Sequence, residues 1–131
     1  MYWYEKDYIM RLIHGISRVL ARMIFGEDIE RDDELIAIME NGVRENNDYL
    51  RNLVDNGRIN DAEDRLFELI ENTAWDDRQK AALAIAFYDY VNEKDDEFLA
   101  AADFSRDEVA EGLVEALKIA NIEVPEYLKI N

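Results

Sequence analysis

Residues 50–70 read LRNLVDNGRINDAEDRLFELI, and this stretch decides the fold class of the chain. Apolar residues recur at helical spacing before Gly57, and a second set follows after it. Asn56 and Gly57 end the first segment, since both residues tolerate the left-handed conformation of a helix end. Asn60, with Glu63 three residues later, predicts a capped start for the second segment. The stretch therefore predicts a hairpin of two antiparallel helices.

The same helical periodicity continues on both sides of the hairpin. No segment alternates apolar and polar residues at period two, so we expect no sheet. We expect one all-α domain over residues 1–131, built as an antiparallel stack of about five to seven helices. The expected helices, the shortest of them at 35–39 and within 93–102, cover residues 8–25, 35–39, 43–55, 60–70, 76–91, 93–102 and 105–121.

Local signals mark several of these boundaries. Gly26 ends the helix expected over residues 8–25, and Asp76 or Asp77 caps the helix expected over residues 76–91. Apolar residues cover almost the whole circumference of that helix, which is typical of a central helix packed on more than one side. Ser105 and Glu108 predict a capping box at the start of the last helix.

The order of large and small apolar residues through the hairpin resembles that of the tetratricopeptide helix pair. This resemblance implies a right-handed array of helix pairs, a class of domain that binds other proteins. A glycine turn and a small residue recur in such pairs at these intervals. The residues that carry the resemblance are Leu50, Leu53, Gly57, Ile59, Ala62, Leu66 and Leu69.

Four short runs elsewhere are similar to those of a family of small bacterial all-helical proteins of unknown function. They are DYIMR at 7–11, GRINDAE at 57–63, FYDY at 87–90 and DFSRDE at 103–108. The resemblance spans most of the chain and implies an all-helical fold. It implies no activity, ligand or site.

The formal net charge of −16 is distributed unevenly along the chain. Residues 1–25 carry four cationic and two acidic side chains, a net of +2, so the remainder carries −18. A field of that sign repels phosphate and anionic lipid within a Debye length of about 8 Å. We therefore expect no nucleic-acid partner, and a membrane surface is a disfavoured one.

The chain contains no cysteine, which excludes disulfides, thiolate metal sites and a thiol nucleophile. The first apolar segment is interrupted by Arg11, His14, Arg18 and Arg22, so it lacks the continuous apolar run of a signal peptide or membrane span. These features favour a cytoplasmic location.

Residues that could perform chemistry are few. His14 is the only histidine, which excludes a metal site built on a histidine pair. The neighbouring acids Asp95, Asp96 and Glu97 point about 100° apart on a helix, so they do not converge on a cation. We expect no metal, no cofactor and no catalytic residue.

Tyr88, Asp89 and Tyr90, in the apolar central helix, are the candidates for lining an interhelical pocket. A buried aspartate without a cationic partner has a raised pKa, and perturbed acids gather at functional sites. The alternative is that Asp89 has only a structural role, because a buried aspartate is commonly neutralised by a helix end or a nearby arginine.

The first helix carries an apolar stripe on one face and basic residues on the other. Its stripe completes the core or contacts a second copy. Its remaining surface is a candidate for partner binding, because aromatic residues and arginine are enriched at interface hot spots. The candidate partner-surface residues are Tyr2, Trp3, Tyr4, Arg11, Arg18 and Arg22.

We therefore expect a non-enzymatic, cytosolic helical domain that mediates protein–protein interaction or self-association, including a homodimer through the first helix. The alternative is a small-ligand-binding or metal-dependent enzyme with an interhelical pocket near Asp89.

Overall fold

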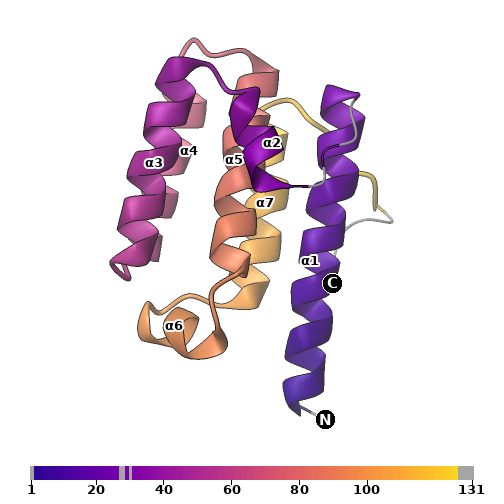
Figure 1. Ribbon diagram of the computed structural model, residues 1–131, viewed down its shortest axis with the longest axis vertical. Helices are drawn as coiled ribbons and strands as arrows, with labels where there is room; N and C mark the ends of the chain where they lie inside the picture. Colours follow the sequence, from indigo (N-terminus) through magenta and orange to yellow (C-terminus); the bar gives the residue numbers. More distant parts are fainter. Residues whose placement is uncertain (1, 27–28, 30, 127–131) are drawn as a thin grey trace.

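The computed structural model of the chain describes residues 2–26, 29 and 31–126, except for the side chains of residues 2–7 and 32. This part of the chain contains seven α-helices and no strand (Figure 1). The prediction of an all-α fold with five to seven helices is confirmed. The helices are α1 (Tyr2–Phe25), α2 (Asp32–Ala37), α3 (Asn41–Asp55), α4 (Ile59–Asn72), α5 (Asp77–Asn92), α6 (Asp96–Ala101) and α7 (Arg106–Ile119).

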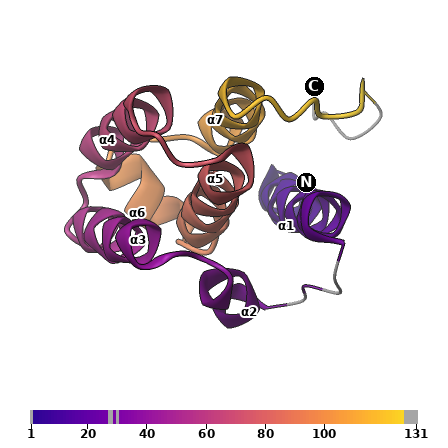
Figure 2. The ribbon, with the colours of Figure 1, turned by 90° about the horizontal axis from the view of Figure 1, so that it is seen from above.

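Helix α5 lies at the centre of the array. Every residue from 81 to 89 is buried, as its apolar circumference predicts. It packs against α1, α2, α3, α4 and α7, and Figure 2 shows these helices around it. Helices α1 and α7 run antiparallel to α5, each on its own side (Figure 1).

Helices α3 and α4 form the predicted hairpin, which turns at Gly57. The φ angle of Gly57 is 77°, in the left-handed region. Its N–H donates to the Val54 carbonyl at 2.9 Å, and the Arg58 N–H donates to the Leu53 carbonyl at 2.9 Å. These two bonds satisfy carbonyl groups at the end of α3 that the helix itself leaves open.

The predicted cap at Asn60 is wrong. Helix α4 begins one residue earlier, at Ile59, and has no side-chain cap at its start. Ile59 is fully buried, so its packing fixes where the helix begins. The Asn60 side chain instead donates to the carbonyl groups of Ala102 and Asp103, at 3.3 and 3.2 Å, and ties α4 to the turn after α6.

The cap predicted for the last helix is confirmed. The Ser105 hydroxyl accepts from the Glu108 N–H at 3.2 Å, and the Glu108 carboxylate accepts from the Ser105 N–H at 3.1 Å. Asp76 caps α5 in the same sense, by accepting from the Gln79 N–H at 2.9 Å. These bonds satisfy donors in the first turn of each helix.

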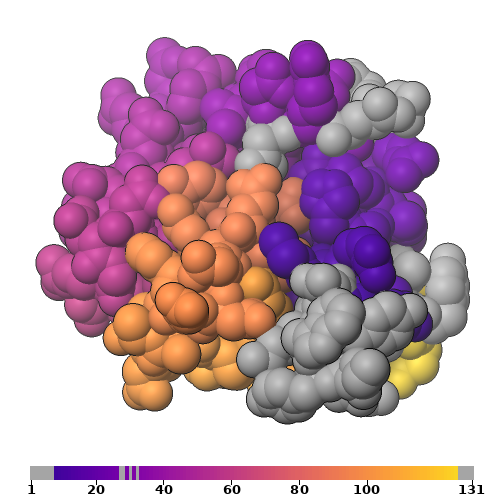
Figure 3. All heavy atoms as spheres, turned by 60° about the horizontal axis from the view of Figure 1, so that its bottom comes forward, coloured from indigo at the N-terminus to yellow at the C-terminus, as the bar shows by residue number. Residues whose placement is uncertain are grey.

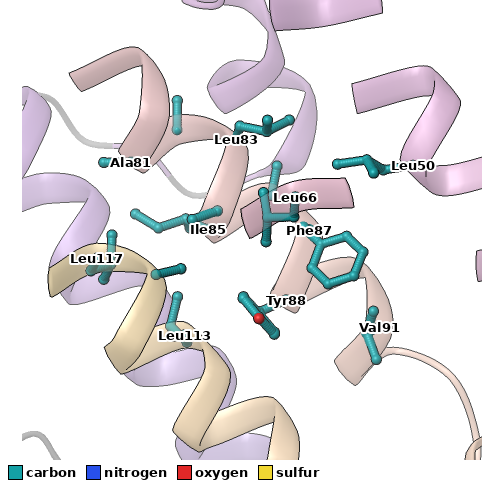
Figure 4. Packing of buried hydrophobic residues seen from close by; sticks show 14 of the residues in the cluster. Leu50, Leu66, Ala81, Leu83, Ile85, Phe87, Tyr88, Val91, Leu113 and Leu117 are labelled. Atoms are coloured by element: carbon teal, nitrogen blue, oxygen red, sulfur yellow. The ribbon is translucent and has the colours of Figure 1, made fainter. Parts of the chain in front are cut away.

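The core is one cluster in which side chains from α3, α4 and α7 meet those of α5 (Figure 4). Phe87 and Tyr88 contact edge to face, with ring centroids 4.9 Å apart. At the end of the array, residues of α6 lie between the α3–α4 pair and α1, and Figure 3 shows this end as orange spheres between magenta and indigo ones. Leu99 of α6 is buried there.

Candidate functional site

Asp89 is buried and contacts two basic side chains of α1. Its carboxylate forms an ion pair with the Arg18 guanidinium, and its Oδ1 lies 3.4 Å from Nδ1 of His14. Arg18 is also buried, whereas the His14 side chain is 55% exposed. The sequence allowed two interpretations of Asp89, a pocket acid with a raised pKa or a structural residue. The geometry agrees with the second, in which a nearby arginine neutralises the carboxylate.

The prediction that Arg18 lies on the partner surface is wrong, because the residue is buried. Its position on α1 lies next to Ser17 and one turn before Ala21, both of which are fully buried. The side chain therefore turns inward to Asp89 and is closed off from a partner. Since breaking a buried ion pair leaves one charge uncompensated, this contact holds α1 against α5.

A second polar cluster joins α1, α5 and α7 one turn further along. The Asn92 side chain donates to the Met10 carbonyl at 2.9 Å. Arg106 donates to the Asn92 carbonyl at 2.6 Å and to its side-chain oxygen at 3.1 Å, and its other terminal nitrogen donates to the Lys94 carbonyl at 2.6 Å. Arg106 thus satisfies carbonyl groups at the carboxyl end of α5.

Tyr88 points away from Asp89, toward α4 and α7. Its hydroxyl donates to Oε2 of Glu63 at 2.6 Å. Burial raises the pKa of Glu63, and the Tyr88 hydrogen bond opposes part of that rise. Burial and the neighbouring Glu63 carboxylate both raise the pKa of Tyr88.

Gly112 of α7 is the residue that gives Tyr88 and Glu63 room. A Cβ atom at Gly112 would lie 2.4 Å from the Tyr88 hydroxyl and 2.6 Å from Oε2 of Glu63. Both distances are shorter than a van der Waals contact, so α7 approaches this hydrogen bond closely only because residue 112 has no side chain.

Tyr90 points toward a third helix, α3. Its hydroxyl donates to Oδ1 of Asp55 at 2.6 Å, and Lys94 donates to the same oxygen at 2.8 Å. Those two bonds, the one from Lys94 first, lower the pKa of Asp55. The Arg51 guanidinium stacks on the Tyr90 ring, 4.4 Å from its centroid.

Tyr88, Asp89 and Tyr90 therefore contact different neighbours and do not converge on one pocket. Consecutive residues of a helix point about 100° apart, and each finds its own partner. Two hollows lined by described residues lie elsewhere. The larger, of about 420 Å³, is lined by Val114, Lys118, Asn121, Ile122, Glu123 and Val124, and the smaller, of about 210 Å³, by Phe25, Ile38, Asp76, Arg78 and Gln79.

The outer face of α1 carries a ridge of apolar residues, Tyr8, Leu12, Val19 and Met23, interrupted by Gly15. We call these five residues the α1 ridge. Tyr8 and Met23 are each 54% exposed. Leu12 and Val19 are half-buried and do not belong to the core cluster of the described residues.

Arg11 and Arg22 follow one edge of the α1 ridge, and both are exposed, as predicted. Arg22 also donates to the Arg18 carbonyl at 3.4 Å. At Gly15, no atom of the described residues lies within 4 Å of the place a Cβ atom would take. The predicted aromatic residues Tyr2, Trp3 and Tyr4 have side chains outside the described residues.

No three His, Asp or Glu side chains in the described part of the chain are grouped so that they could hold a metal ion. Within the same part, no helix is long and apolar enough to cross a membrane.

Sequence reasoning missed Glu63, Gly112, Arg106 and Asn47 as residues of structural consequence. Glu63 was assigned to a cap, yet it accepts from Tyr88, which lies 25 residues away. Asn47 is 1% exposed, and its side-chain amide makes no hydrogen bond to another described residue. The sequence indicated the burial of Asn47 only through its position four residues after the apolar Val43, on the same face of the helix.

Residues 3–121 match the profile of a family described as Family of unknown function (DUF6483). No curated protein matches the chain, and no solved structure matches it.

Proposed function

The chain belongs to this family of unknown function, and we propose that it acts as a non-enzymatic helical domain that binds another protein through the outer face of α1. The observation that carries the proposal is the α1 ridge with Arg11 and Arg22 along its edge. Exposed apolar residues that lie together, next to arginine, are typical of protein interfaces.

The burial pattern of α1 supports this assignment. The inner face of the helix packs on α5 and α7, and Ile13 and Leu20 there are buried. The α1 ridge lies outside that packing. The core of the described residues therefore does not account for the apolar residues on the outer face of this helix.

Two further features belong to the proposal. The α3–α4 hairpin has the glycine turn and the small Ala62 of a tetratricopeptide pair, which favours a binding domain. A cytoplasmic location is supported by the cysteine-free composition, which suits a reducing compartment. Fractionation of native cells with an antibody against the protein tests the location.

The proposal is tested by affinity capture from native cells with two variants at the centre of the α1 ridge. Gly15→Trp fills the open space at residue 15, and Gly15→Ala changes the same position by one methyl group. We expect Gly15→Trp to lose proteins that the wild type and Gly15→Ala both capture. An identical set from all three proteins would show that this face binds no partner.

The engagement of Asp89 with Arg18 and His14 weighs against the alternative of an enzyme with a pocket at that residue. Neither described hollow is lined by Tyr88, Asp89 or Tyr90. A thermal-shift panel of metals and metabolites tests the alternative, since a ligand that binds only the folded state raises its melting temperature. A ligand-specific rise that Asp89→Asn abolishes would favour the enzyme.

A further inference from the structure

We propose that Asn41 is a site of spontaneous deamidation, at which the Gly42 nitrogen attacks the side-chain amide with the assistance of Arg44. The chain contains two asparagine–glycine pairs, at residues 41–42 and 56–57. Glycine after asparagine permits this reaction, because a residue without a side chain gives its main-chain nitrogen access to the amide carbon. The two pairs are identical in sequence, but the structure holds them differently.

The reaction has two steps, and water is its only co-reactant. The Gly42 nitrogen attacks Cγ of Asn41, so an N–Cγ bond forms and the Cγ–Nδ2 bond breaks. The proton of the Gly42 N–H leaves with the amide nitrogen as ammonia, and a cyclic imide remains. Water then opens the imide at either of its carbonyl groups, which gives aspartate or isoaspartate at position 41.

The attacking nitrogen is open at the first pair and engaged at the second. Gly42 is the second residue of α3 and is exposed, and its N–H makes no hydrogen bond to another described residue. A helix leaves its first N–H groups without a main-chain acceptor, and no side chain caps α3. The Gly57 N–H, by contrast, donates to the Val54 carbonyl at 2.9 Å. That bond must break before the Gly57 nitrogen can react.

The Asn41 side chain has a donor at the oxygen that becomes charged. The Arg44 guanidinium donates to Oδ1 of Asn41 at 3.4 Å. This oxygen gains negative charge when the nitrogen attacks Cγ, and a donor placed there stabilises the intermediate. Arg44 is held in position by its other terminal nitrogen, which donates to the Met39 carbonyl at 2.8 Å.

The Asn56 side chain is instead held away from the nitrogen that would attack it. Its Nδ2 donates to the Asn52 carbonyl at 2.7 Å and to Oδ1 of Asn52 at 3.0 Å. Both bonds direct the amide back along α3. Rotation of the amide toward the Gly57 nitrogen therefore breaks these two bonds as well as the bond of the Gly57 N–H.

Fewer bonds oppose the reaction at Asn41. It is the first residue of α3, and helix ends open more readily than positions held on both sides. Its displacement breaks the bond from the Arg44 N–H to the Glu40 carbonyl and strains the bond from the Glu40 N–H to Gln79. Three bonds break at Asn56. This difference and the Arg44 donation together make Asn41 about tenfold faster to react.

Peptide mapping by mass spectrometry measures both sites in one sample. Trypsin cleaves after arginine, so Asn41 falls in the peptide of residues 32–44 and Asn56 in that of residues 52–58. The folded protein is aged at neutral pH and physiological temperature, and the aspartyl and isoaspartyl forms of each peptide are followed with time. We expect Asn41 to be converted about tenfold faster than Asn56. Equal rates, or faster conversion of Asn56, would overturn the proposal.

The same measurement in urea separates the effect of the fold from that of the sequence. Unfolding removes the hydrogen bonds at both pairs, so the two rates should converge. A difference that persists in urea would show that the fold is not its cause, and the proposal would then be wrong.

The variant Gly42→Ala tests the attacking nitrogen. The added Cβ atom would lie 4.0 Å from Nε1 of Trp75, an ordinary contact, so the helix accommodates it. We expect the methyl group to slow conversion of Asn41 by about tenfold or more, because it crowds the approach to Cγ, and to leave Asn56 unchanged. Loss of Asn41 at the wild-type rate would mean that the reaction does not pass through the Gly42 nitrogen.

The variant Arg44→Met tests the donor to Oδ1 of Asn41. We expect it to slow conversion of Asn41 severalfold without changing Asn56. Arg65→Met makes the same change in net charge at an arginine of α4 that pairs with Glu68, and it should react as the wild type does. Circular dichroism verifies that each variant is helical. An Asn41 rate in Arg44→Met that equals or exceeds that of Arg65→Met would refute the assistance by Arg44.

Discussion

The substitution Gly112→Ala tests the packing of α4, α5 and α7 directly. The new methyl group would lie 2.4 Å from the Tyr88 hydroxyl and 2.6 Å from both Oε2 of Glu63 and Cε1 of Tyr88. Relief of such overlap by backbone or side-chain shifts costs about 1–3 kcal/mol. Displacement of the Tyr88 hydroxyl from Glu63 leaves a buried polar group without its bond, which costs about 1–3 kcal/mol more.

One term opposes these costs. Alanine favours a helix interior over glycine by about 1 kcal/mol. We therefore expect Gly112→Ala to lower the free energy of unfolding by about 2–3 kcal/mol, with a fall in melting temperature of roughly 10 °C for a chain of this size. The measurement is urea and thermal unfolding followed by circular dichroism at the helical band.

Two further variants decide whether the Tyr88 hydroxyl is the cause. Gly15→Ala makes the same change in the exposed part of α1, where no described atom lies within 4 Å, and is expected to stabilise by up to about 1 kcal/mol. In a Tyr88→Phe background the oxygen is gone, so Gly112→Ala should cost about 1 kcal/mol less than in the wild type. An equal cost in both backgrounds, or a Gly112→Ala protein as stable as the wild type, would refute the reasoning.

Three other predictions concern charged groups. Asp89→Asn should lower the free energy of unfolding by about 3–5 kcal/mol, because it removes the carboxylate charge that pairs with the buried Arg18, while R18M/D89L should cost far less in the same urea titration; equal losses would contradict a buried ion pair. Burial raises the pKa of Glu63 in the folded state, so the stabilisation from its protonation is present in acid and is lost as pH rises through that pKa. Glu63→Gln should therefore gain stability relative to the wild type from acid to neutral pH. Plots of the free energy of unfolding against pH that run parallel for the two proteins would count against this prediction. Lys94 and Tyr90 lower the pKa of Asp55, so the stabilisation from its carboxylate is present above the ordinary carboxyl pKa range and is lost as pH falls through the pKa of the folded state. Asp55→Asn should therefore cost at most about 1 kcal/mol of stability at neutral pH and nothing in strong acid. A cost that persists in acid would mean that the charge is not its source.

Features set by neighbouring residues in the sequence were predictable. The turn at Gly57 and the cap at Ser105 depend on contacts within about six residues, and both are present. Asn60 has the same pattern as Ser105, yet α4 begins at Ile59. Burial of Ile59 outweighs the cap, because a fully buried isoleucine side chain contributes more than one surface hydrogen bond.

Features set by residues far apart in the sequence could not be predicted. Arg18 and Asp89 are separated by 71 residues, and a helical wheel places Arg18 with the other basic residues of α1. Tyr88 and Glu63 lie 25 residues apart, and the need for glycine at position 112 arises only when α7 packs against both. The helical periodicity of a sequence does not indicate contacts between residues this far apart.

The Arg18 ion pair also bears on how α1 presents its outer face. A helix that packs through apolar side chains alone can settle at more than one rotation about its axis, since such contacts have little directionality. An ion pair and the hydrogen bond from Asn92 to the Met10 carbonyl attach two points on one side of α1. With those points fixed against α5, Tyr8 and Met23 are held on the solvent side. The buried polar groups of the central helix thus contribute to the proposed function by orienting the ridge.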